Sequence, residues 1–315
     1  MGRGRSVSAL AEANSLTVGA GVGRDVSPRS PRARARFDLA WLGLLPFGLY
    51  LLFFLALPTV LAIGSGVVVN GRFEWANLAS LADPVILHTF WNSTWLSLLT
   101  AVIGAVVGAA VCYAMLGLPQ VGTVRTLVDA AAGVLAQFGG VMLAFAFIAT
   151  IGIKGVVTQG LVHYLGVDIF ANGAWIYDLP GLILPYIYFQ VPLMVITFTP
   201  AMAALKPQWA EANLTLGGTR RGFWWHVGLP VLMPSFLAGL LLLFANSFSS
   251  YATAAALASQ GSQIVTLQIR TALTSETLLG RQNLAGVLAL GMVVVVSLVM
   301  WAYAAIQRRA TRWQS

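Results

Sequence analysis

Residues 211–230 read EANLTLGGTRRGFWWHVGLP and lie between two long apolar segments. The stretch combines several charges, a glycine pair and a cluster of aromatic side chains. Pro207, just upstream, is tolerated in the first turn of a helix. Gly217 and Gly218 end such a helix because glycine adopts a left-handed turn at little steric cost, and Thr219 is a favourable N-cap for a second one. The sequence therefore predicts a helix, a tight turn and a second helix that lie along a membrane face.

The composition of the whole chain is that of a membrane protein. Of its 315 residues, 58% are hydrophobic and 9% are charged, whereas a soluble domain carries about 25% charged residues. The net charge of +8 comes from basic residues beside apolar segments, so lipid and topology explain it better than nucleic acid does. The single cysteine, Cys112, lies in an apolar segment and is expected to be a buried packing residue.

Six apolar segments are each long enough to cross a bilayer as a helix, and they predict an all-α integral membrane protein. We expect these transmembrane helices over about residues 41–64, 88–116, 127–151, 174–202, 229–258 and 284–306. Gly104, Ala105, Gly108 and Ala109 suit close helix packing in the second of them. Residues 1–36 hold seven arginines and almost no large apolar side chains, which indicates a disordered, basic cytoplasmic tail before a transmembrane domain over 37–315.

The positions of lysine and arginine predict which loops face the cytoplasm. Fourteen of the 18 lie in the N-terminal tail, the loop at 117–126, the loop around Glu211 and the C-terminus. The other three connections hold the remaining four: Arg72, Lys154, Arg270 and Arg281. By the positive-inside rule, both termini and the Glu211 loop are expected in the cytoplasm.

The sequence offers no motif for catalysis or for a cofactor. It has no G-x-x-x-x-G-K-[ST] loop for ATP, no histidine and cysteine cluster at metal spacing and no G-x-S-x-G nucleophile elbow. His88, His163 and His226 are far apart near predicted span ends, as loop or interfacial histidines are. We expect a chain that is not an enzyme and that binds no metal.

Several polar side chains fall inside predicted spans, where exposure to lipid is costly. They are Gln137 in the third span, Gln190 in the fourth, and Asn246, Ser250 and Tyr251 in the fifth. Two interpretations stay open: they line a water-filled translocation path, or they form hydrogen bonds between helices. The absence of a carboxylate in mid-span argues against a proton- or ion-coupled secondary transporter.

The spacing inside 211–230 resembles a loop found in the inner-membrane permeases of binding-protein-dependent ABC importers, the MetI-like superfamily. That loop reads Glu-Ala-Ala, three residues, Gly, nine residues, Ile, one residue and Leu-Pro. Asn213 and Val227 depart from it, standing where the family has alanine and isoleucine. The matching positions here are Glu211, Ala212, Gly217, Leu229 and Pro230.

The resemblance spans about residues 85–306 and implies a function for the loop at 206–228. In the family this coupling loop docks into a groove on a cytoplasmic ATPase and transmits its motion. The partners it implies are ABC ATPase subunits that bind ATP and magnesium, a second permease subunit in a homo- or heterodimer, and an extracytoplasmic solute-binding protein. The implied location is the bacterial plasma (inner) membrane, as a multi-pass protein.

The solute is suggested by two further stretches. KGVVTQGLVHYLGV at 154–167 and FANSFSSYATAAALA at 244–258 look most like spermidine and putrescine permeases, so a polyamine is the expected solute. Importers of phosphonate, thiamine or ferric iron are alternatives in the same family. A secondary transporter and a membrane scaffold or enzyme subunit are alternatives outside it, and no nucleic acid is expected as a partner.

The predicted orientation can be tested by cysteine labelling in a Cys112→Ala background. Single cysteines at Asp83, Asp168 and Glu276 should react with a membrane-impermeant thiol reagent in intact cells, because the basic residues place these loops outside. A cysteine at Arg309 should react only after the cells are lysed. Labelling at Arg309 in intact cells, without labelling at the other three sites, would reverse the topology.

Overall fold

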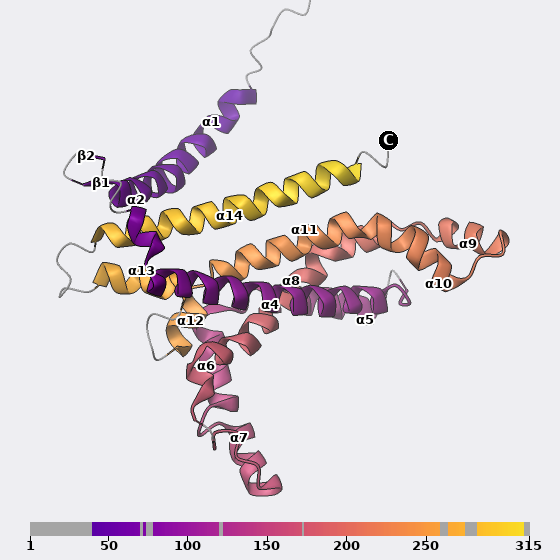
Figure 1. Ribbon diagram of the computed structural model, residues 1–315. Coiled ribbons are helices and arrows are strands. Elements are labelled where there is room, and N and C mark those ends of the chain that lie inside the picture. Colours follow the sequence, from indigo (N-terminus) through magenta and orange to yellow (C-terminus); the bar gives the residue numbers. More distant parts are fainter. Residues whose placement is uncertain are drawn as a thin grey trace, which may run out of the picture. The chain divides into compact units, whose positions relative to one another are not determined.

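The computed structural model describes residues 40–69, 72–73, 78–119, 122–171, 173–258, 264–274 and 282–311 (Figure 1). The chain divides into two units, Met1–Leu52 and Phe53–Ser315. The first unit contains α1 (Ala40–Leu51), a helix with Pro46 in its interior. The predicted tail at 1–36 lies outside the described residues, as do Glu276 and Arg281, two charged residues used in the sequence analysis.

The second unit is almost wholly helical where it is described. A π turn (Leu52–Ala56), whose first residue is the last of the first unit, leads into α2 (Leu57–Val67). A two-residue antiparallel ladder follows between β1 (Val68–Val69) and β2 (Arg72–Phe73). The other helices are α4 (Pro84–Met115), α5 (Thr123–Gln137), α6 (Gly140–Ile151), α7 (Val156–Gly160), α8 (Ile183–Ala203), α9 (Pro207–Thr215), α10 (Arg220–Phe223), α11 (Leu229–Phe248), α12 (Ala252–Leu257), α13 (Val265–Thr274) and α14 (Gln282–Thr311). The all-α prediction is confirmed.

Short turns connect several of these helices. They are 3-10 turns at Ser80–Ala82, Trp175–Tyr177 and Leu179–Leu182 and π turns at Leu161–Leu165 and Trp224–Gly228. Six stretches of the described chain are long and apolar enough to span a bilayer, as the sequence predicts. They are Leu44–Val67, Pro84–Met115, Gly140–Leu165, Leu179–Ala203, Arg220–Phe248 and Asn283–Ala305.

The core of the second unit forms where α4 packs along α8 and α11. Small residues permit this close approach, since a Cβ atom built on Gly104 would lie 2.7 Å from Gln190 Cβ. A Cβ atom on Gly108 would lie 2.5 Å from Met194 Cβ. The predicted close packing of the second span at these glycines is therefore confirmed. Helix α14 packs on α11 and on α2.

The prediction of one helix over 127–151 is wrong. The chain leaves the helix at Phe138 and Gly139, and α6 starts at Gly140 with φ +72°, a conformation that favours glycine. Length and composition select Gly140–Leu165 as the third candidate span, which takes in Lys154 and His163 from the predicted 152–173 connection.

Helices α5 and α6 lie along opposite halves of α8. Ala132 of α5 shares a core cluster with Val195 and Phe198, from the C-terminal half of α8. Residues Leu143 and Ala144 of α6 instead share a cluster with Tyr186 and Phe189, from its N-terminal half. The break at Phe138–Gly139 thus separates a helix that packs with the C-terminal half of α8 from one that packs with its N-terminal half.

The predicted fifth span, 229–258, is also divided. Helix α11 ends at Phe248 and α12 begins at Ala252, so the chain is broken over residues 249–251. At the other end α10 runs through the π turn into α11, which gives one helical stretch of 29 residues (Figure 1). The π turn immediately precedes Leu229-Pro230, where the proline has no N–H to complete a regular helical hydrogen bond.

Gly108 gives a direct test of the α4–α8 packing. In Gly108→Ala the new methyl group must displace Met194, and overpacking of this kind costs about 1–3 kcal/mol. The thermal unfolding midpoint of the purified protein in detergent should therefore fall. Gly133→Ala is the matched control on α5, because its Cβ meets no atom within 4 Å, and it should leave the midpoint unchanged or raise it. Equal midpoints for both variants would contradict this packing.

Candidate functional site

The loop at 206–228 folds as the helix, tight turn and helix that the sequence predicts. Helix α9 has Pro207 in its first turn. After it, Gly217 has φ +80° and its N–H donates to Leu214 O at 3.0 Å. The N–H of Gly218 donates to Asn213 O at 2.8 Å, which satisfies a carbonyl at the helix end. The predicted left-handed conformation of Gly217 is confirmed.

Two side chains hold the turn closed. The hydroxyl of Thr219 accepts a hydrogen bond from Gly222 N at 3.1 Å, so Thr219 caps α10 as predicted. Across the turn, Asn213 Nδ2 donates to Thr219 O at 3.1 Å. The alanine that the resembling motif carries at this position could not form that bond. The departure of Asn213 from the family's alanine thus has a structural consequence that the sequence analysis did not predict.

The outer surface of the loop is exposed and mixes charge with apolar side chains. Glu211 and Ala212 are both exposed on α9. Leu216 at the tip is 87% exposed and Trp225 is 63% exposed. Exposed large apolar side chains gathered on so short a segment are typical of a docking surface.

The inner side of the loop is joined to the membrane helices. The ring of Trp224 packs edge-on against Tyr113 of α4, with centroids 5.1 Å apart, and against the buried Phe223. Within the π turn, His226 Nδ1 lies 2.9 Å from Gly222 O. Helix α10 continues through the π turn into α11, so this arm of the loop and α11 form one continuous helical stretch.

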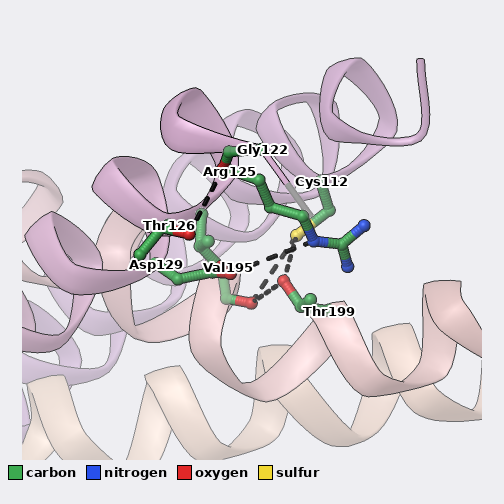
Figure 2. A network of polar contacts seen from close by, with 7 residues as sticks. All are labelled: Cys112, Gly122, Arg125, Thr126, Asp129, Val195 and Thr199. Carbon is green, nitrogen blue, oxygen red and sulfur yellow. Dashed lines mark hydrogen bonds and ion pairs between the residues drawn. The ribbon is translucent and has the colours of Figure 1, made fainter. Parts of the chain in front are cut away.

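A second polar contact region lies between α4, α5 and α8 (Figure 2). The Cys112 thiol is buried and lies 3.5 Å from Thr199 Oγ1 and 3.7 Å from Val195 O. Beside it on α5, Arg125 and Asp129 form an ion pair at 4.0 Å. Cys112 therefore joins α4 to α8 as a buried residue, as expected from the sequence.

Of the polar side chains predicted for a translocation path, Gln190 is fully buried between three helices. Its Nε2 donates to Thr100 Oγ1 of α4 at 2.8 Å, and Thr100 Oγ1 lies 3.2 Å from Ser247 Oγ of α11. Its Oε1 has no hydrogen-bond partner in the described part of the chain. In this conformation Gln190 joins helices rather than facing an open space.

The other four residues lie at the two helix breaks. Gln137 ends α5 and is exposed, Asn246 and Tyr251 are exposed on either side of the end of α11, and Ser250 is half-buried between α11 and α12. They are thus brought to the interruptions in two neighbouring helical segments.

Hydrogen bonds connect these two breaks to their neighbours. The N–H of Gly140 donates to Thr253 Oγ1 at 3.0 Å, which links the start of α6 to α12. The hydroxyl of Tyr186, from α8, donates to Ser250 O at 3.0 Å. Sequence reasoning missed Tyr186 and did not predict the contact of Thr253, a polar residue of the predicted fifth span, with Gly140, although the Gly139–Gly140 pair in an apolar segment was a signal for the first break.

Several known proteins are similar in sequence to this chain over part of its length. The sulfate transport system permease protein CysT of Salmonella typhimurium is 28% identical over 127 residues, 40% of this chain and 43% of that protein. The spermidine/putrescine transport system permease protein PotC homolog of Mycoplasma genitalium is 36% identical over 70 residues, 22% of this chain and 25% of that protein. The matched segments thus span less than half the length of these curated relatives.

Solved structures show the same fold across most of the chain. A bacterial ABC transporter involved in alginate import matches with a TM-score of 0.70 and 17% identity, over 86% of this chain and 95% of that one. A chain of the MetNI methionine ABC transporter matches with a TM-score of 0.51 and 16% identity, over 76% and 99%. Residues 141–312 match the family model for the binding-protein-dependent transport system inner membrane component. With its six apolar spans and the loop at Glu211, this chain belongs to that family of inner membrane transport components, as its sequence resemblance predicts.

Proposed function

We propose that this chain is the transmembrane permease subunit of an ATP-driven ABC importer. The observation that carries the proposal is the exposed helix–turn–helix at 206–228, which bears the Glu211 motif and continues directly into a membrane helix. Family membership supports a component of a binding-protein-dependent importer. ATP and magnesium would bind to separate ATPase subunits, and this chain would catalyse no reaction.

The geometry supports a simple route for the motion of the ATPase. A stretch of 29 residues extends about 44 Å at the helical rise of about 1.5 Å per residue. An ATPase that moves the coupling loop would therefore displace the far end of α11, at Phe248. That end adjoins the break at 249–251, whose next helix, α12, is bonded to α6 through Thr253. The two breaks would then shift together and open the path to the other side.

We place Gln137, Asn246, Ser250 and Tyr251 along that path. The first two and Tyr251 are exposed, and all four carry groups that lipid does not solvate. Gln190 does not line this path in the present conformation. It links α8 to α4 through its hydrogen bond to Thr100. The path would be completed by a second permease subunit, as a homo- or heterodimer, and supplied by an extracytoplasmic binding protein.

The setting of such an importer would be the bacterial plasma membrane, with both termini in the cytoplasm. The basic residues of the Glu211 loop support this orientation, because positive loops stay on the cytoplasmic side. The similar alginate transporter was solved with a periplasmic protein that carries an alginate pentasaccharide. A binding protein is proposed here to act from the corresponding side.

Two solute classes have support. The match to a spermidine/putrescine permease homologue and the stretches at 154–167 and 244–258 favour a polyamine. The longer match to a sulfate permease favours sulfate as the second candidate. The amide and hydroxyl groups at the helix breaks are neutral, and they can donate to an oxyanion or accept from an ammonium group. We choose the polyamine as the solute, with sulfate as the alternative.

Glu211 and Gly217 test the coupling function. Glu211→Ala removes a charged contact, and hydrogen bonds to charged groups are worth about 1.5–3 kcal/mol, so ATPase affinity should fall about tenfold or more. Gly217→Val forces a β-branched residue into φ +80° and should tilt the turn. Both variants should insert normally but lose solute-stimulated ATP hydrolysis in proteoliposomes.

The control for these variants is Gln208→Ala, an exposed position of α9 outside the motif. It should bind ATPase and support uptake as the unmodified protein does. If Glu211→Ala and Gly217→Val also behave like the unmodified protein, the loop is not the coupling element and the proposed function fails.

The solute is tested by uptake of labelled spermidine and of labelled sulfate into proteoliposomes that hold the complete importer. Spermidine uptake that requires ATP and is inhibited by unlabelled putrescine is the expected result. Asn246→Leu should slow that uptake while leaving ATPase assembly intact. Thr150→Val on α6, whose hydroxyl donates to Ala146 O and Phe147 O of its own helix, should not slow it. Uptake of sulfate alone would replace the polyamine, and normal uptake by Asn246→Leu would remove that residue from the path.

A further inference from the structure

A hollow of about 890 Å³ lies between the C-terminal end of α4 and the coupling loop. One wall is formed by α4 and the loop after it, through Tyr113, Leu116 and Gly117. The opposite wall comes from both arms of the coupling loop. The hollow thus lies at the point where α4 and α8 end and where the α10–α11 stretch begins.

The charges around this hollow are unbalanced. Lys206, Arg220 and Arg221 all line it, and Glu211 is the single acidic residue among its lining residues. Neither these three cations nor Glu211 takes part in an ion pair within the described ranges of the chain. All three cations are exposed. The hollow therefore has a net positive lining with free hydrogen-bond donors, which suits an anion.

The uncharged part of the lining narrows the class of anion. Tyr113 and Trp224 meet edge to face in the wall, and Phe223, Leu205 and Leu214 add apolar surface. Aromatic side chains gather at the level of lipid headgroups, and clustered basic residues at the cytoplasmic face attract anionic lipids. A ligand with a phosphate group and an attached hydrocarbon part can contact both the basic residues and the apolar lining. A free inorganic ion would contact only the basic residues.

We propose that this hollow binds the phosphate headgroup of an anionic phospholipid from the cytoplasmic leaflet and thereby steadies the coupling loop. Guanidinium groups bind phosphate oxygens in a bidentate manner, so Arg220 and Arg221 are the principal contacts, and Lys206 adds a third positive charge. Lys206 precedes α9 and the arginines begin α10. A bound phosphate would hold the two arms of the loop together. The assignment rests on the proposed function only for the cytoplasmic placement of the loop.

The test uses the full-length permease alone, without ATPase or solute, so that its outcome is separate from that of the importer assay. Phosphatidylglycerol and phosphatidylcholine are titrated into the detergent-purified protein, and bound lipid is measured by native mass spectrometry. Phosphatidylglycerol should bind in preference. In the double variant Arg220→Gln with Arg221→Gln its binding should weaken about 30-fold, because each basic residue near a membrane surface contributes roughly a factor of five.

Two further variants separate charge from folding. Arg220→Lys with Arg221→Lys keeps the positive charges and should retain most of the binding. Arg125→Gln removes one arginine from the predicted cytoplasmic face, but that arginine is paired with Asp129, so binding should change less than about threefold. A uniform loss of binding in all three variants would indicate damage to the fold and would overturn the site.

The remaining outcomes decide which anion the hollow takes. Equal binding of the two lipids, or unchanged phosphatidylglycerol binding in the double glutamine variant, would reject the lipid site. Displacement of the lipid by inorganic phosphate at comparable concentration would assign the hollow to a free phosphate instead. If the double glutamine variant binds lipid normally but no longer co-purifies with the ATPase, the cations serve an acidic surface of that partner and the proposal fails.

Discussion

The demand that every backbone polar group find a partner in an apolar environment governs this structure, because the helices predicted over 127–151 and 229–258 are both interrupted. Lipid offers no hydrogen bonds, so an interruption persists only where neighbouring protein supplies them. Here Thr253 accepts from the N–H of Gly140 at the start of α6, and Tyr186 donates to the carbonyl of Ser250 after α11. Each of these partners comes from a different helix. The hydrogen bonds that stabilise the two breaks therefore also hold α6, α8 and α12 in their arrangement.

This arrangement gives the long α10–α11 stretch a defined end. At its N-terminal end the stretch adjoins the coupling loop, and Trp224 packs there against Tyr113 of α4. At its C-terminal end Ser247 lies close to Thr100, which also accepts a hydrogen bond from the buried amide of Gln190. A hydrogen bond of this kind contributes about 0.5–1.5 kcal/mol, too little to lock the helices but enough to set a preferred position. The α10–α11 stretch is therefore held at each end by contacts that are individually weak.

Local chemistry made the coupling loop predictable, whereas tertiary contacts made the breaks unpredictable. The positive φ of Gly217 and the Thr219 cap depend on residues within a few positions, so the sequence suffices for both. Hydropathy averages over a window of many residues, so it joined α5 to α6 across Phe138 and Gly139 and α11 to α12 across 249–251. The partners that stabilise those breaks lie far away in the chain. The same reason hid the role of Gln190, whose contact with Thr100 joins residues 90 positions apart.

The coupling loop and the two helix breaks should consequently differ in how they respond to substitutions. In the coupling loop, the bonds from Asn213 to Thr219 and from Gly222 to Thr219 lie within ten residues of each other and are exposed to water. Their loss alters the shape of the loop but exposes no buried group, so the spans can remain folded. At the breaks, Thr253 and Tyr186 are buried and their removal would leave backbone groups unpaired in an apolar environment. An unpaired buried group lowers the free energy of unfolding by about 1–3 kcal/mol, so its effect is on the stability of the whole helix arrangement. Loss of the bonds around Thr219 should therefore leave the spans folded, whereas loss of the bonds at the breaks should destabilise the fold.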